Sequence, residues 1–297
     1  MTIIAKYDVV CVVAFDAGAG AQIANYIVNF PNKIFFSLGG PAIEIFDNLF
    51  KDLENISLEE AIRVSDIVIC GTGWQSDYEW ECIKLCKKLK KPVIACIDHW
   101  VNYRARFIRN GSQVLPDEIW VFDEYARELA EEKFPSINVV QKTNYYLIEQ
   151  VKQIKQKEDQ KSVDCETILY LLEPIRELWN QPFAGEFEAL DVFINNLALI
   201  SLDKKIEIHL KPHPTDIKGK YDDWLLKHQD LNISITTASL SEAIAHSTVV
   251  VGCRTYAMVV ALYAGRTVYS SIPADVKTAR LPYKNIIQLD NMAPLSI

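Results

Sequence analysis

The sequence lacks the short motifs that mark several large enzyme classes. It contains no Gly-x-x-x-x-Gly-Lys-[Ser/Thr] phosphate loop, no Gly-x-Ser-x-Gly nucleophile elbow and no His-Glu-x-x-His zinc motif. An Asp-x-Asp pair, which could hold a divalent cation, is also missing. These absences argue against a P-loop ATPase, an α/β-hydrolase, a zinc protease and a site built around Mg²⁺. We therefore expect no metal and no separate cofactor.

Long apolar runs and excess positive charge are scarce as well. The first apolar run, Val9–Phe15, is too short to span a bilayer, and no cleavage-type sequence follows it. The 297 residues carry a formal net charge of -8. A surface of that sign disfavours nucleic acid as a partner. These features predict a cytoplasmic protein that does not bind nucleic acid.

The seven cysteines show no spacing typical of a disulfide framework. Most lie within apolar runs, as expected for buried, reduced thiols. Cys82 and Cys86 are four residues apart on an expected helix and could reach one metal ion. No histidine or second cysteine pair lies near them, so we favour reduced thiols over a metal site.

Strand and helix patterns alternate along the whole chain. Short β-branched, apolar runs predict buried parallel strands at 8–15, 33–38, 67–70, 92–97, 118–122, 138–141, 167–172, 205–210, 233–236, 248–252, 267–270 and 285–288. Helical patterns lie between them, at 20–29, 41–49, 57–64, 77–89, 124–133, 185–200, 220–228, 240–246 and 256–264. This alternation predicts the α/β class with doubly wound sheets.

The chain is long enough for two such domains. The segment 149–166 is rich in Lys, Gln, Glu and Asp, which predicts an exposed helix and linker. We expect Rossmann-like domains at 1–148 and 167–297, facing each other across a cleft. One internal match supports this division, because Ser57–Ile69 aligns with Ser239–Val251. Each segment predicts a serine-capped helix that leads into a buried strand.

Ligands of open α/β sheets bind beyond the carboxyl ends of the strands. In the second half, Lys211-Pro-His213-Pro follows a predicted strand, and the two prolines fix the backbone around the imidazole. His213 can donate to a phosphate or a leaving-group oxygen beside the ammonium of Lys211. The alternative is a rigid surface turn whose histidine is incidental.

A second loop of this half, Gly252-Cys-Arg254-Thr255, opens a predicted helix. The backbone N–H groups of a helix start, with the hydroxyl of Thr255 and the charge of Arg254, form a reasonable phosphate cradle. The alternative is that Thr255 is a plain N-cap. Glu173, after the first strand of this half, is a further candidate for contact with the nucleotide or sugar.

The first half offers Asp16-Ala-Gly-Ala-Gly20 after its first strand. This loop matches a dinucleotide glycine fingerprint only loosely, since Ile23 occupies the third glycine position and no acidic residue ends the second strand. We therefore do not expect NAD. Asp16 is a candidate general base for an attacking hydroxyl, and the alternative is an N-cap aspartate.

The loop at 98–107 follows another strand and combines aromatic, cationic and hydrogen-bonding side chains, as sugar sites do. His99 is a second candidate base. The candidate acceptor-binding residues are Trp74, Trp100, Asn102 and Arg104. The alternative is an amphipathic loop that covers the sheet.

Three segments of the second half resemble the donor domain of bacterial GT-B glycosyltransferases. They are Lys211-Pro-His213-Pro, Ser239-Leu-x-Glu-Ala-Ile and Val-Val-Gly252-x-x-Thr255. The resemblance extends over 168–271 and is nearest to sialyl-, polysialyl- and capsule Kdo-transferases. It implies that His213 and Thr255 bind the donor nucleotide and its phosphate. The sequence departs from the pattern where Arg254 replaces a second hydroxyl residue, and Asp16-Ala-Gly matches the acidic-Gly motif of the first domain only approximately.

The resemblance implies a metal-independent glycosyltransferase that moves a sugar from a nucleotide donor, such as a CMP-activated nonulosonate or Kdo-like sugar. The acceptor would be a surface glycan or lipid-linked glycan, with peripheral association with membrane-bound glycan machinery. On this hypothesis the catalytic residues are Asp16, His99 and His213, and the donor-binding residues are Lys211, His213, Arg254, Thr255 and Glu173. The alternatives are a UDP-sugar transferase, a glycerol phosphate transferase, a non-catalytic two-lobed binding protein, or a nucleotide-sugar 2-epimerase, which would need more carboxylates.

Overall fold

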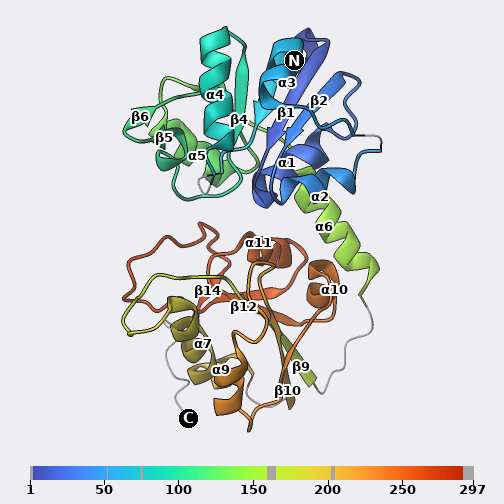
Figure 1. Ribbon diagram of the computed structural model, residues 1–297. Helices are drawn as coiled ribbons and strands as arrows, with labels where there is room; N and C mark the ends of the chain where they lie inside the picture. Colours follow the sequence, from blue (N-terminus) through green and yellow to red (C-terminus); the bar gives the residue numbers. More distant parts are fainter. Residues whose placement is uncertain (1–2, 52, 74–75, 159–164, 202–204, 290–297) are drawn as a thin grey trace. The chain divides into compact units, whose positions relative to one another are not determined.

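The computed structural model describes residues 3–51, 53–73, 76–158, 165–201 and 205–289 (Figure 1). These residues form two compact units, 1–146 and 147–297. Each unit contains one six-stranded parallel sheet and its own hydrophobic core. Both sheets are flanked by helices, as the alternating sequence pattern predicts for the α/β class.

The sheet of the first unit has the strand order β2-β1-β3-β4-β7-β8. Its strands are β1 (Val9–Ala14), β2 (Lys33–Leu38), β3 (Ile67–Cys70), β4 (Val93–Cys96), β7 (Glu118–Val121) and β8 (Asn138–Gln141). Its helices are α1 (Ala17–Ile27), α2 (Ala42–Asp47), α3 (Leu58–Val64), α4 (Tyr78–Leu89) and α5 (Glu124–Lys133). Every residue of β3, β4 and β7 is buried, because helices cover both faces of a parallel sheet.

The sheet of the second unit has the order β11-β10-β9-β12-β13-β14. Its strands are β9 (Cys165–Leu171), β10 (Lys205–Lys211), β11 (Ile233–Ile235), β12 (Val249–Gly252), β13 (Thr267–Ser270) and β14 (Ile287–Gln288). Its helices are α7 (Gly185–Asn195), α8 (Leu197–Ile200), α9 (Asp222–Lys227), α10 (Leu240–Ala245) and α11 (Tyr256–Tyr263). Helix α6 (Tyr145–Gln156) begins at the boundary between the units and occupies part of the range expected to be a linker.

The strand order of each sheet reverses at one place. In the first unit the reversal lies between β1 and β3, and in the second it lies between β9 and β12. Parallel sheets bind ligands at such reversals, beyond the carboxyl ends of the strands. We call this end of each sheet its carboxyl edge.

The internal sequence match corresponds to equivalent structure. Ser57 accepts a hydrogen bond from Glu60 N and caps α3, while Ser239 forms a complete capping box with Glu242 at the start of α10. The strands that follow, β3 and β12, each pair with the first strand of their own sheet. Both segments therefore lead to the place where the strand order reverses.

The sequence prediction was wrong about one helix start and missed several short elements. Helix α1 begins at Ala17 rather than at Gly20, so the glycines expected to form a loop lie in its first turn. The helix expected at 185–200 is divided into α7 and α8. The missed elements are the 3-10 turns Ile3–Lys6 and Ala105–Phe107, and the hairpin of β5 (Ile108–Arg109) and β6 (Ser112–Gln113). Such short pieces carry too few residues for a periodic signal.

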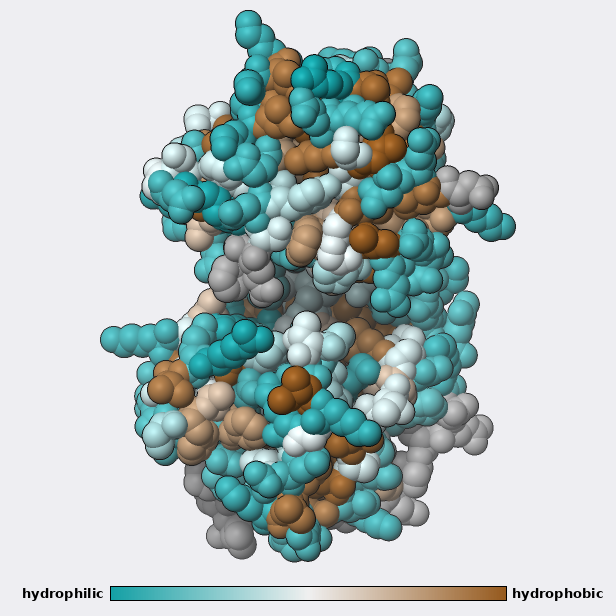
Figure 2. Space-filling view, in the orientation of Figure 1, coloured by the Kyte–Doolittle hydropathy of each residue, from teal (hydrophilic) through white to brown (hydrophobic). Residues whose placement is uncertain are grey.

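No helix in the described parts of the chain is long and apolar enough to cross a membrane. On the face shown in Figure 2, polar side chains predominate and apolar residues form small, separate patches. Singly exposed apolar residues of this kind are normal for globular proteins.

Candidate functional site

Lys211 and His213 lie at the carboxyl edge of the second sheet. Lys211 is the last residue of β10, and its ammonium donates to Ala238 O at 2.6 Å. Nδ1 of His213 accepts from Thr215 N at 3.2 Å and lies 2.8 Å from Thr215 Oγ1. An imidazole whose Nδ1 accepts a backbone N–H carries its proton on Nε2 when neutral. His213 can therefore offer an Nε2–H group to a ligand.

The loop that carries His213 is held by a buried carboxylate. Asp216 accepts from His213 N at 2.9 Å and from the Tyr221 hydroxyl at 3.0 Å. Its other oxygen pairs with Lys220 Nζ at 2.6 Å, and Glu186 pairs with the same ammonium at 2.5 Å. Burial lowers the pKa of His213, with Asp216 opposing and Lys220 adding to this effect, so the neutral imidazole predominates at neutral pH.

Glu173 and Arg254 meet where the strand order of the second sheet reverses. Arg254 N donates to Glu173 Oε2 at 3.0 Å, and Arg254 Nε lies 3.4 Å from Glu173 Oε1. Arg254 also pairs with Glu177 at 3.1 Å and hydrogen-bonds Thr278. Burial raises the pKa of Glu173, and Arg254 opposes this rise. The guanidinium is thus fixed in place, with part of its charge compensated by two carboxylates.

Thr255 caps α11, the helix that follows this loop. Its Oγ1 accepts from Ala257 N at 3.4 Å, so it occupies the N-cap position of α11. The weak capping bond leaves room for the hydroxyl and the helix N–H groups to meet an anion. The structure thus gathers Lys211, Glu173, Arg254 and Thr255, with the His213 loop, at the ends of three adjacent strands.

Asp16 lies at the carboxyl edge of the first sheet, between β1 and α1. It is the N-cap residue of α1, yet its side chain makes no capping hydrogen bond, and no other described residue bonds its carboxylate. Burial raises the pKa of Asp16, the nearby Asp98 raises it further, and Arg106 opposes both. Asp16 is half-buried, so it can meet both protein and ligand.

Asp98 and Arg106 form an ion pair beside Asp16. Arg106 Nη1 donates to Asp98 Oδ1 at 2.9 Å and to both oxygens of Thr72 at 3.0 Å. A Cβ atom on Gly18 would lie 2.0 Å from Asp98 Oδ2, so this carboxylate packs against the first turn of α1. The first turn favours a negative charge, because the backbone N–H groups there are unpaired.

Glu79 on α4 is a third carboxylate of this edge, and it is completely buried. It accepts from Phe15 N at 3.0 Å and also from Gly73 N. Burial raises the pKa of Glu79 to about 7, with further contributions from Asp16 and Asp98, while the two backbone N–H groups oppose the rise.

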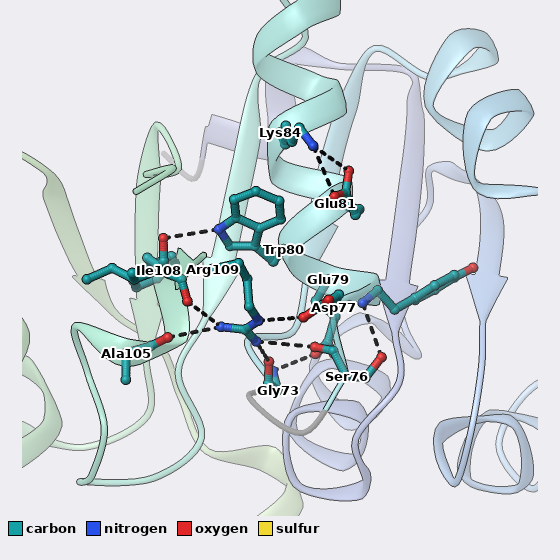
Figure 3. Close-up of polar contacts among 12 residues, drawn as sticks. Gly73, Ser76, Asp77, Glu79, Trp80, Glu81, Lys84, Ala105, Ile108 and Arg109 are labelled. Atoms are coloured by element: carbon teal, nitrogen blue, oxygen red, sulfur yellow. Dashed lines mark hydrogen bonds and ion pairs between the residues drawn. The ribbon is translucent and has the colours of Figure 1, made fainter. Parts of the chain in front are cut away.

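Arg109 anchors the loop between β3 and α4 (Figure 3). Its guanidinium donates to Gly73 O at 3.0 Å and Ser76 O at 3.2 Å, and it pairs with Asp77 at 2.7 Å. It also donates to Ala105 O and Ile108 O, so it joins this loop to the β5–β6 hairpin. Gly73 is therefore bonded through both its N–H and its C=O.

The other candidate residues of the first half differ in how far they are exposed to solvent. Trp100 is only 8% exposed and donates its indole N–H to Asp123, so little of its ring face is open to a sugar. Nδ1 of His99 accepts from Trp100 N at 3.0 Å. Asn102 and Arg104 are exposed, and Asn102 has a left-handed backbone with φ of 60°. Trp74 lies outside the described residues.

The sequence interpretation missed Glu79, Arg106 and Asp98 as partners of Asp16. Asp98 was visible as the first residue after a predicted strand, but Glu79 lies in the second position of a helix, where an acidic residue is commonplace. Arg106 lies inside a loop, and no sequence pattern predicts that this loop folds back on Thr72. Among the described residues, no group of three or more His, Cys, Asp or Glu side chains could hold a metal ion.

No protein-family model matches the chain, and no curated protein matches it. The chain is similar to several solved structures, among them the following two. One, from Listeria monocytogenes and provisionally assigned as a UDP-N-acetylglucosamine 2-epimerase, is 11% identical, with a TM-score of 0.59 over 89% of this chain and 78% of that chain. The other, MurG from Acinetobacter baumannii, is 12% identical, with a TM-score of 0.52 over 96% of this chain and 87% of that chain.

The fold is of the GT-B type. At these identities the likeness shows the fold of two Rossmann-like domains and nothing about chemistry. An activity for this GT-B chain has to be argued from its own side chains.

Proposed function

We propose that this protein is a metal-independent glycosyltransferase that takes its sugar from a nucleotide donor bound at the carboxyl edge of the second sheet. The observation that carries the proposal is the state of His213, whose Nδ1 is engaged by Thr215 while its Nε2 has no partner among the described residues. A fixed Nε2–H group beside a lysine suits recognition of a phosphate oxygen.

The donor side has the electrostatics that a departing phosphate needs. Lys211 and Arg254 supply positive charge, Thr255 supplies a hydroxyl, and the N-terminus of α11 supplies backbone N–H groups. Groups fixed before the reaction stabilise developing negative charge without reorganising. Glu173 lies beside them as an acceptor for a sugar or ribose hydroxyl.

Of the three carboxylates described at the carboxyl edge of the first sheet, Asp16 is the one best placed to accept a proton. Asp98 is bound by Arg106 and Glu79 by two backbone N–H groups, which leaves Asp16 to take a proton. In the proposed step the acceptor oxygen bonds to the anomeric carbon, the bond from that carbon to the donor phosphate breaks, and the acceptor proton passes to Asp16. Burial and the neighbouring Asp98 raise the pKa of Asp16, which makes its carboxylate a stronger base.

For the donor we propose a CMP-activated nonulosonate or Kdo-like sugar, and for the acceptor a surface glycan or lipid-linked glycan. The Pro-bracketed His213 and the Thr255 cap support this choice through the motif resemblance. His99 remains an alternative base, and exposed Asn102 and Arg104 remain candidates for acceptor contacts.

A second candidate, a nucleotide-sugar 2-epimerase, is favoured by the three carboxylates that gather at the first sheet. This reaction removes a proton from one face of a sugar and returns one on the other, so it needs more than one accessible acid or base. Glu79 is buried and Asp98 is ion-paired, so we rank the epimerase below the transferase.

The decisive experiment is a calorimetric titration with CMP, CDP, UDP and GDP on the wild-type protein, His213→Ala and the control His209→Ala. His209 lies four residues before His213, within β10, and bonds Ser234 instead. We expect CMP to bind most tightly, and we expect His213→Ala to weaken it about 10- to 100-fold, as loss of a hydrogen bond to a charged group does. His209→Ala should stay within about twofold.

Preference for UDP would instead favour the UDP-sugar transferase or the epimerase. Failure of all four nucleotides to bind the wild-type protein, or equal binding by His213→Ala, would refute the proposed donor site.

A further inference from the structure

Glu79 connects the two loops that meet at Asp16. Its Oε1 accepts from Phe15 N, in the residue just before Asp16, and its Oε2 accepts from Gly73 N, in the loop after β3. The side chain comes from α4, and its relative exposure is 0%. Burying a carboxylate costs free energy unless its oxygens accept hydrogen bonds, and here each oxygen accepts one.

Two glycines leave open the space that the Glu79 carboxylate occupies. A Cβ atom on Gly71 would lie 2.1 Å from Glu79 Oε1, and one on Gly73 would lie 2.6 Å from Oε2. The same point at Gly73 lies 2.1 Å from Asp16 Oδ2. Asp16 and Glu79 therefore pack on one glycine, whose carbonyl is fixed by Arg109 (Figure 3).

We propose that Glu79 is a positioning residue for Asp16, because it bonds the residue before Asp16 and the glycine against which the Asp16 carboxylate packs. The proposal rests on the proposed role of Asp16 as the base. Glu79 itself is fully buried and acts only through Asp16. It fixes the direction in which Asp16 faces an acceptor hydroxyl, and its charge acts on the charge of Asp16.

The charged and titratable groups around Glu79 come from several elements. Asp16 immediately precedes α1, Asp98 follows β4 and pairs with Arg106, and the thiols of Cys70 and Cys96 lie on β3 and β4. Tyr78 precedes Glu79 on α4. Burial raises the pKa of Glu79 to about 7, and the charges of Asp16 and Asp98 add to this rise, so the two carboxylates Asp16 and Glu79 influence each other's ionisation.

The first test is kinetic and uses Glu79→Gln, with Asp66→Asn as matched control. Glutamine keeps the size of the side chain but turns one of two acceptors into a donor, which opposes an N–H group. Asp66 also accepts a β1 backbone N–H, from Val9 at 2.9 Å, but at the opposite end of the strand. We expect Glu79→Gln to lower kcat about 10- to 100-fold with donor KM unchanged, as misplacement of a catalytic group does, and Asp66→Asn to change kcat less than about twofold.

A double-mutant comparison separates positioning from general damage. If Glu79 acts through Asp16, then Asp16→Asn with Glu79→Gln should be no slower than Asp16→Asn alone. Rates that multiply instead would overturn the proposal.

The second test does not need turnover, and its main result is read from the wild-type protein. Carbon-13 labelling of aspartate carboxyls allows the Asp16 signal to be followed by NMR as pH rises. We expect two inflections in the wild-type protein, its own and a second near pH 7 as Glu79 ionises, and only one in Glu79→Gln. A single inflection in the wild-type protein would overturn the proposal. If two inflections are present but no sugar is transferred to any acceptor, the transferase proposal is refuted, and the proposed effect of Glu79 on Asp16 stands.

Discussion

Replacing Gly18 with alanine tests the packing of the first carboxyl edge. In most helices this change stabilises, by about 1 kcal/mol, because alanine is the better helix former. Here the new Cβ would lie 2.0 Å from Asp98 Oδ2, while the other oxygen of that carboxylate is 2.9 Å from Arg106. Asp98 must therefore move and weaken its bond to Arg106, which costs about 2 to 3 kcal/mol for a charged hydrogen bond.

The two effects together predict a net loss of about 1 to 2 kcal/mol for Gly18→Ala, measured by urea unfolding. The same substitution in an Asp98→Ala background meets no carboxylate, so we expect it to be neutral or to stabilise by up to about 1 kcal/mol. If Gly18→Ala alone is as stable as the wild-type protein, or if the two backgrounds respond alike, the close approach of Asp98 to α1 is refuted.

Three further predictions concern other parts of the molecule. Six cysteines are buried, so Ellman's reagent should reach at most Cys165, the partly exposed thiol, before unfolding; rapid reaction of several thiols in the native protein would contradict this. The pKa of Glu79 is raised from 4.5 to about 7, so the folded protein holds this proton more tightly than the unfolded chain. The free energy of unfolding of the wild-type protein should therefore fall as pH rises between these values, and Glu79→Gln should lack this contribution to the fall. If the free energies of both proteins depend on pH in the same way, the raised pKa is excluded. Asp216→Ala should destabilise by about 1 to 3 kcal/mol, because His213 N and the Tyr221 hydroxyl lose their acceptor while Lys220 keeps Glu186, and it should weaken CMP binding by releasing the His213 loop; an unchanged urea midpoint would contradict this.

Much of the fold follows from local sequence patterns. The strands are short, β-branched runs, and their pairing in two parallel sheets follows from the helices between them. The start of α1 was mispredicted because glycines disfavour helices. Gly18 is needed there for a reason that no local rule contains, the approach of Asp98 from 80 residues further along the chain.

The candidate site was predictable only in part. His213 and Thr255 follow strands closely, which is what made them candidates, whereas Glu79 and Arg106 reach the neighbours of Asp16, Phe15 and Asp98, through tertiary folding. The burial of Trp100 likewise depends on its bond to Asp123, which caps another helix. Contacts between segments that are distant in the chain produce no periodicity or motif spacing, so a single sequence does not predict them.

Both halves of the molecule carry an arginine where their strand order reverses, although the two come from unrelated places in the chain. Arg106 reaches Thr72 and Asp98 from a loop after β4, while Arg254 reaches Glu173 from the loop after β12 itself. Arginine keeps its proton at every pH at which a protein survives. Each reversal point thus holds a planar fork of N–H donors fixed against a carboxylate, which gives both sheets the same kind of polar anchor at the place where their order turns.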